Sequence, residues 1–137
     1  MSERRVCVFF YGLFMDEAML RSRGLAPTEA QAASVDGWAL RIGRRAALVP
    51  QDGSVVHGIA MHLTHAEIER LYGDESVAQY RPEPVIARLA DKRDVAALCW
   101  NLPAAPGPGE RNEQYAAKLR EVARRAGLPE GYVAAIR

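Results

Sequence analysis

The sequence lacks an excess of charge of either sign. Its 18 lysines and arginines are balanced by 17 aspartates and glutamates, which gives a formal net charge of +1. Proteins that bind nucleic acid or an anionic membrane through electrostatic attraction typically carry a basic excess. The balance argues against both, so we expect no nucleic-acid partner and no membrane partner.

Cysteine is scarce, and no apolar run is long. Cys7 and Cys99 each lie inside an apolar segment and have neither the spacing of metal ligands nor that of a disulfide framework. The apolar run over residues 6–15 is too short to span a bilayer, and Asp16 and Glu17 follow it instead of a cleavage site. These features favour a reduced, cytoplasmic protein.

Common nucleotide-binding, hydrolase and metalloprotease motifs are absent from the sequence, including G-x-G-x-x-G, the Walker loop, G-x-S-x-G and H-E-x-x-H. His57, His62 and His65 are close in sequence. However, alternate residues of a strand point to opposite faces, so the first two diverge, and the third lies beyond the strand. We therefore expect no bound metal and no cofactor.

What the sequence does contain is a series of β-type segments with few helices between them. The 137 residues fit one domain over 1–137. Asp36-Gly37 and residues 51–54 are typical of turns. The pattern predicts an α+β fold, with an antiparallel or mixed sheet closed into a small barrel and flanked by short helices. We expect strands over 6–11, 30–35, 38–42, 46–49, 55–63, 80–89 and 95–102, and helices over 15–23, 66–71, 113–126 and after 129.

Several single residues predict where these elements begin and end. Thr64 and Glu67 form the spacing of a capping box, which opens the second helix. Asn112 is expected to cap the third helix. Pro82 and Pro84 place the start of their strand at a sheet edge or bulge, since proline donates no hydrogen bond to a neighbouring strand.

The loop over residues 11–15 is the first candidate for function. It joins a buried strand to a helix, and Gly12 permits a tight turn and a close approach of the backbone. Backbone N–H groups at the start of a helix have no intrahelical partner. We expect them to be available to an anion or a polarised carbonyl.

Acidic residues after the second helix are the second candidate. Asp74 and Glu75 lie in a polar loop, where a carboxylate at a pocket mouth can act first as general base and then as general acid. Glu83 is a poorer candidate because it is expected on the surface of a strand. Arg44 and Arg45 could bind an anion, but arginines beside a turn are ordinarily solvated, and we leave them out of the site.

Taken together, these segments resemble the gamma-glutamylcyclotransferase-like superfamily, which includes the AIG2-like proteins. The opening F-Y-G-L-F-M is similar to the family's F-Y-G-[ST]-[NL]-[LM], and L-Y-G-D-E is similar to L-D-x-x-E. A central strand of the form V-x-G-x-x-[YF]-x-[LM] and a C-terminal Q-Y…G-L-P-x-x-Y also have counterparts. The matching segments are residues 10–15, 56–64, 71–75, 80, 114–115, 127–129 and 132.

The resemblance implies a small mixed barrel with a cavity at one end, no cofactor and no metal. It implies a small-molecule substrate that carries a γ-glutamyl group. Glu75 would take a proton from the α-ammonium, and the amine would attack the γ-carbonyl to give 5-oxoproline and a free amine. Such a carboxyl group is expected to be partly removed from water, which raises its pKa. The implied substrate-binding residues are Tyr11, Gly12, Leu13, Phe14, Met15, Tyr80 and Tyr115.

The sequence departs from the family pattern at the site itself. Leu13 and Phe14 stand where many members carry Ser-Asn or Thr-Leu, and Tyr72 stands where L-D-x-x-E has aspartate. Asp74 also lies beside Glu75, so the alignment can shift by one residue. Three alternatives therefore stay open: a module of the same fold that binds a small molecule without chemistry, an amide hydrolase, and a protein–protein adaptor. The oligomeric state also stays open, with a homodimer as one option.

Overall fold

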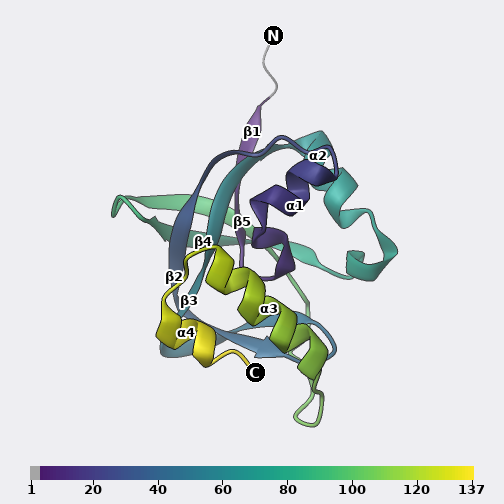
Figure 1. Ribbon diagram of the computed structural model, residues 1–137, viewed down its shortest axis with the longest axis vertical. Helices are drawn as coiled ribbons and strands as arrows, with labels where there is room; N and C mark the ends of the chain where they lie inside the picture. Colours follow the sequence, from purple (N-terminus) through teal and green to yellow (C-terminus); the bar gives the residue numbers. More distant parts are fainter. Residues whose placement is uncertain (1–3) are drawn as a thin grey trace.

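A closed, five-stranded β-barrel forms the centre of the fold in the computed structural model, which describes residues 4–137 (Figure 1). Neighbouring strands follow the order β1-β3-β2-β4-β5. β1 and β5 close the barrel in parallel, with Val8 opposite Leu98, and the other pairs are antiparallel. The predicted mixed α+β barrel is confirmed. The strands are β1 (Arg5–Phe10), β2 (Thr28–Ile42), β3 (Ala46–Thr64), β4 (Arg81–Leu89) and β5 (Asp94–Asn101).

β1 is apolar from Val6 to its end because it packs on both of its faces. Val8 and Phe10 belong to a hydrophobic cluster shared with the helices outside the barrel. Phe9 and Tyr11 belong to a second cluster, inside the barrel. Successive side chains of a strand point to opposite faces. Because the last residues of β1 and Tyr11 contribute to a hydrophobic core on each face, this part of the sequence is continuously apolar.

β2 and β3 are each one long strand, whereas the sequence predicted two shorter strands in place of each. β2 and β3 pair with each other as far as Asp36, which lies opposite Val55. The pairing is interrupted there and resumes at Trp38, which lies opposite Pro50. Gly37, with a φ of +86°, therefore lies opposite several residues of β3. The residues expected to form separate turns form a bulge instead, and bulges of this kind bend a strand pair so that a barrel can close.

Gly58 allows β1 and β3 to approach closely. A Cβ atom at this position would lie 2.1 Å from the carbonyl oxygen of Phe10, far inside van der Waals contact. The glycine of the central strand motif therefore has a packing role. Any side chain at this position would push β3 away from β1, the strand that leads into the loop at Gly12.

The helices lie around the barrel, and their ends largely match the predicted signals. The capping box of Thr64 and Glu67 is present, and Asn112 caps α3 through the backbone N–H of Tyr115. The helix predicted over 15–23 is divided into a 3₁₀ turn and α1, because the side chain of Asp16 caps α1. The elements are η1 (Leu13–Met15), α1 (Glu17–Ser22), α2 (His65–Tyr72), η2 (Glu75–Val77), α3 (Glu113–Arg125) and α4 (Glu130–Ala134).

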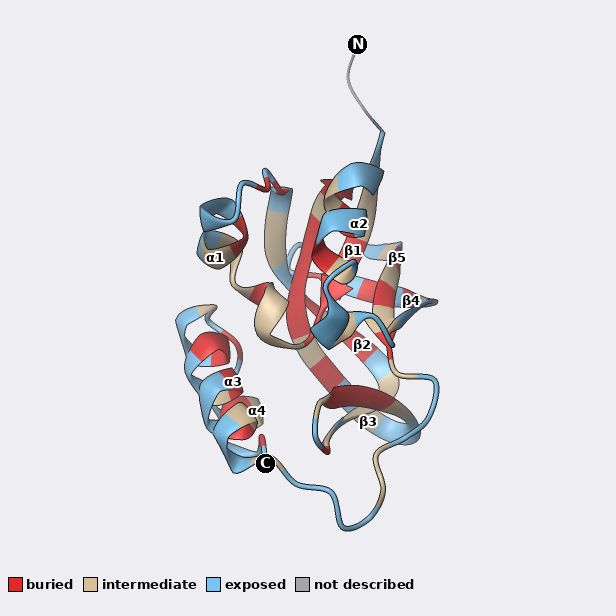
Figure 2. Ribbon diagram, turned by 90° about the vertical axis from the view of Figure 1, so that its right-hand side faces the viewer, coloured by how far each residue is buried: buried red, intermediate tan, exposed pale blue. Residues whose placement is uncertain are grey.

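α3 and α4 pack against each other beside the barrel, near the C-terminus (Figure 1). The buried positions of α3 follow one face of the helix (Figure 2), and they include Leu119 and Val122. α3 contacts η1, which brings the segment after β1 against a helix from the last part of the sequence. Within residues 4–137, no helix is both long and apolar enough to cross a membrane.

Candidate functional site

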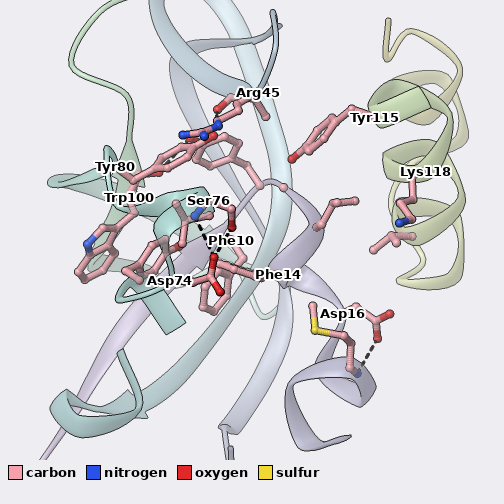
Figure 3. A pocket seen from close by; sticks show the side chains of 18 of the residues that line it. Phe10, Phe14, Asp16, Arg45, Asp74, Ser76, Tyr80, Trp100, Tyr115 and Lys118 are labelled. Atoms are coloured by element: carbon pink, nitrogen blue, oxygen red, sulfur yellow. Dashed lines mark hydrogen bonds between the residues drawn. The ribbon is translucent and has the colours of Figure 1, made fainter. Parts of the chain in front are cut away.

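A cavity of about 620 Å³ lies where η1, η2, the turn before β3 and the start of α3 meet. Figure 3 shows Tyr115 and Lys118 reaching toward it from α3, with Tyr80 and Trp100 on the other side. Its size falls in the usual range of pockets that hold a small organic molecule. Of the substrate-binding residues predicted from the sequence, those that line the cavity are Tyr11, Gly12, Leu13, Phe14, Tyr80 and Tyr115.

The loop after β1 forms one wall of the cavity. Met15 N–H donates to the carbonyl of Gly12 at 3.0 Å, and Asp16 N–H donates to that of Leu13 at 3.4 Å. These bonds close the 3₁₀ turn and leave the amides of Leu13 and Phe14 outside its own hydrogen bonds. Met15 does not line the cavity; its side chain is 2% exposed and packs in the core beneath the loop.

Aromatic side chains make up most of the remaining wall. Every aromatic residue of the chain except Trp38 and Tyr132 lines this cavity. The ring of Phe14 meets that of Tyr72 edge-on at 5.6 Å, and Tyr72 stacks on Trp100 at 4.9 Å. Phe14 thus places a ring, held in an aromatic cluster, where the resembling family pattern has Asn or Leu.

Two of the tyrosine hydroxyls in the site donate hydrogen bonds to backbone carbonyls. Tyr11 donates to the carbonyl of Trp100 at 2.9 Å, and Tyr80 donates to that of Ala46. Burial raises the pKa of Tyr11 and of Tyr80, and it raises the pKa of Tyr115 to about 12. All three phenols therefore stay protonated at neutral pH, which excludes them as general bases in the resting site.

Asp74 is the carboxylate of the η2 turn that lines the cavity. Its Oδ1 atom accepts hydrogen bonds from the backbone N–H of Ser76 at 2.8 Å and from the Ser76 hydroxyl at 2.6 Å. Those bonds lower the pKa of Asp74. Glu75 begins η2, is exposed and lies outside the lining, so its role as acid and base stays a prediction.

Two residues that the sequence analysis did not assign to the site belong to it or support it. Arg45 is half-buried and lines the cavity. Asn101 is 3% exposed at the end of β5, where its amide bonds both backbone groups of Leu48 and also donates to Glu83. Nothing in the local sequence around either residue indicates these roles, because Leu48 and Glu83 are distant from Asn101 in the sequence, and Gln79 is distant from Arg45.

Within the described part of the chain, no three histidine, cysteine, aspartate or glutamate side chains are grouped as a metal site would require. His57 meets the ring of Tyr132, whereas His62 contacts Glu29 at 3.1 Å. The polar groups of the cavity lining include carboxylates, phenols and the guanidinium groups of Arg23, Arg45 and Arg125.

Solved structures with the same fold include gamma-glutamyl cyclotransferases. One described by that name superposes with a TM-score of 0.75 at 16% identity, over 98% of this chain and 89% of that chain. The uncharacterized human protein loc79017 gives a TM-score of 0.76 at 18% identity, with the same coverage. A yeast enzyme described as specific to glutathione gives 0.66 at 15% identity, over 96% and 93%. Identities this low show a shared fold alone.

The sequence itself provides the family assignment. No curated protein matches the chain. The model of the family described as "Gamma-glutamyl cyclotransferase, AIG2-like" matches residues 8–120, a stretch that runs from β1 into α3 and includes the cavity loop, the η2 turn and Tyr115. The chain therefore belongs to the gamma-glutamyl cyclotransferase, AIG2-like family.

Proposed function

We propose that this protein converts a γ-glutamyl amide, either of an amino acid or of an amine, into 5-oxoproline and releases the amine. The observation that carries the proposal is the cavity itself: the loop at Gly12, the η2 turn and Tyr115, all within the family match, line one space. Family membership supports the reaction class, and the geometry supplies groups suited to it.

The reaction needs proton transfer and positioning but no external reactant. The α-nitrogen of the glutamyl group forms a bond to its own γ-carbonyl carbon, and the bond between that carbon and the leaving nitrogen breaks. Two protons leave the attacking nitrogen, and two reach the departing one, so an ammonium enters and an ammonium leaves. Attack within one molecule is accelerated chiefly by holding the reactive conformer.

The cavity wall offers donors for the charge that develops during this attack. The amide of Phe14 has no partner within the 3₁₀ turn, and the amide of Leu13 faces the hydroxyl oxygen of Tyr115. Backbone amides held in place by a turn stabilise a tetrahedral oxyanion without reorganisation. The Tyr115 phenol, whose pKa is about 12, adds a protonated hydroxyl beside this loop.

We assign proton transfer to Glu75, the acid of the L-Y-G-D-E segment that resembles the family's L-D-x-x-E. Glu75 lies between Asp74 and Ser76, which both line the cavity, so the backbone of this residue is at the edge of the cavity. Catalytic geometry is often incomplete before substrate binds. The lowered pKa of Asp74 suits a group that stays ionised and holds the substrate's α-ammonium.

The adaptor alternative has little support from the surface. Among the described residues, the exposed large hydrophobic side chains are Val55 and Ile86 alone, and two residues do not make a broad apolar patch.

Product analysis tests the proposal against the two remaining alternatives. Purified protein is incubated with γ-glutamyl amino acids and γ-glutamyl amines, and the products are identified by mass spectrometry. We expect 5-oxoproline and free amine in equal amounts. Release of glutamate instead of 5-oxoproline would indicate an amide hydrolase. Saturable binding of these compounds without any product would indicate a binding module.

A further inference from the structure

Five half-buried aromatic side chains face the cavity from five different parts of the chain. They come from η1, α2, the residue before β4, β5 and α3. Phe14, Tyr80 and Trp100 all pack against Tyr72, and Tyr115 faces this cluster from the other side of the cavity, so the five rings form an apolar lining on two sides. We refer to it as the aromatic wall: Phe14, Tyr72, Tyr80, Trp100 and Tyr115.

The γ-glutamyl group has no ring or large apolar part that could pack on the aromatic wall. That group carries an ammonium, a carboxylate and an amide on a short aliphatic chain. In the proposed reaction the loop amides and Asp74 bind these polar groups. A cavity of about 620 Å³ also has room for considerably more than a glutamyl group. Aromatic rings attract other rings through offset stacking and edge contacts in addition to apolar burial. The wall is therefore suited to the other half of the substrate, the leaving amine.

Arg45 adds a fixed positive charge next to the aromatic wall. Its Nη1 atom donates to the side-chain oxygen of Gln79 at 3.2 Å, and its charge acts on the Tyr80 phenol. Within residues 4–137, no carboxylate forms a salt bridge with it. A half-buried guanidinium without a carboxylate partner is a ready site for a planar anion such as a carboxylate.

We propose that the leaving amine is an aromatic amino acid, whose ring packs on the aromatic wall and whose carboxylate binds Arg45. The inference rests on the proposed function and names the substrate class within it. Arg45 and the aromatic wall are then specificity residues: they select the substrate, while the loop and the η2 turn carry the chemistry.

Steady-state kinetics with three substrates separates the two contacts. We expect kcat/KM for γ-glutamyl-phenylalanine to exceed that for γ-glutamyl-alanine, which lacks the ring, by about tenfold or more. We expect a similar advantage over γ-glutamyl-phenethylamine, which keeps the ring and lacks the carboxylate. Equal values for all three substrates would overturn the inference and leave the proposed function intact.

Substitution of Arg45 tests its contact alone. Arg45→Gln should lower kcat/KM for γ-glutamyl-phenylalanine by about tenfold and leave the value for γ-glutamyl-phenethylamine unchanged. Arg44→Gln is the matched control, because Arg44 is exposed and does not line the cavity. Equal losses on both substrates in Arg45→Gln would contradict a carboxylate contact, and so would the same selective loss in Arg44→Gln.

Calorimetric binding of free phenylalanine and free alanine gives an answer that does not depend on turnover. We expect phenylalanine to bind wild-type protein more tightly than alanine, because only phenylalanine has the ring. Arg45→Gln should weaken phenylalanine binding by about tenfold, because the substitution removes the partner of its carboxylate. If no substrate yields 5-oxoproline but phenylalanine still binds in this way, the proposed function fails and the aromatic amino-acid site stands. Absence of both turnover and phenylalanine binding would overturn both.

Discussion

The hydroxyl oxygen of Tyr115 lies directly against Gly12, so that a Cβ atom on the glycine would be 2.9 Å from it. This contact joins the loop after β1 to the first turn of α3 and closes one side of the cavity. The glycine and the tyrosine are therefore matched in size, and neither can be changed without consequence for the other.

Gly12→Ala should lower activity by about tenfold or more, because the methyl group would displace Tyr115 or the loop that carries the Leu13 and Phe14 amides. Tyr115→Phe removes the oxygen that the methyl group meets. The double variant should therefore be more active than Gly12→Ala alone. The measurement is the rate of 5-oxoproline release for the four proteins, and strictly multiplicative losses would contradict the contact.

Gly58→Ala should prevent stable folding or lower the free energy of unfolding by roughly 3 kcal/mol or more, since its methyl group would overlap the Phe10 carbonyl. Gly131→Ala is the matched control. Gly131 lies in α4 with open space around it, so alanine there should be neutral or stabilising by up to about 1 kcal/mol. Urea denaturation measures both, and similar effects of the two substitutions would contradict the close approach of β1 and β3.

Asn101→Ala should lower the free energy of unfolding by roughly 2–4 kcal/mol. The substitution leaves the buried N–H and carbonyl of Leu48 without the side chain that bonds both. Gln114→Ala, at an exposed position of α3, should change the value by less than about 0.5 kcal/mol. A loss below about 1 kcal/mol for Asn101→Ala in chemical denaturation would contradict its role as the link between β5 and β3.

The stability of the protein should depend on pH because of the ionisation of Glu67, which caps the N-terminus of α2. Burial alone would raise the pKa of Glu67, but hydrogen bonds from Thr64 and Ala26 and the charge of Arg5 outweigh it and lower the pKa below 4.5. Because the pKa of Glu67 is lower in the folded protein than in the unfolded chain, its ionised carboxylate stabilises the folded state above about pH 4.5. This stabilisation is lost as the pH falls through the pKa that Glu67 has in the folded protein.

Glu67→Gln should therefore destabilise the protein by about 1 kcal/mol at pH 7 and by clearly less at pH 3. The measurement is the thermal midpoint of both proteins across this range. A difference between wild type and variant that does not change with pH would contradict the lowered pKa.

Features set by neighbours in the sequence could be predicted. The capping box of Thr64 and Glu67 and the cap at Asn112 depend on residues three positions apart, and the sequence indicates both correctly. The alternation that supplies two cores from β1 also follows from a local period. The cavity-lining residues Tyr80 and Tyr115 were found through family motifs and not through any local rule.

Features set by the closure of the barrel could not be predicted. The bulge opposite Gly37 depends on how β2 and β3 bend together, which local turn residues do not encode. Asn101 meets Leu48 across 53 positions of sequence, and Arg45 reaches the cavity only because the turn before β3 lies beside Tyr80. The conformation of the η2 turn, which directs Asp74 rather than Glu75 to the cavity, is likewise a tertiary property.

The measurement that tests the central claim most directly is 5-oxoproline formation by wild type, Glu75→Gln, Asp74→Asn and Glu69→Gln. Glu69 is an exposed glutamate of the neighbouring helix and serves as the control. We predict product from wild type and Glu69→Gln, a loss of at least about 100-fold in kcat for Glu75→Gln, and a smaller loss dominated by KM for Asp74→Asn. Full activity of Glu75→Gln would contradict Glu75 as the acid and base, and no product from wild type on any γ-glutamyl amide would contradict the proposed reaction.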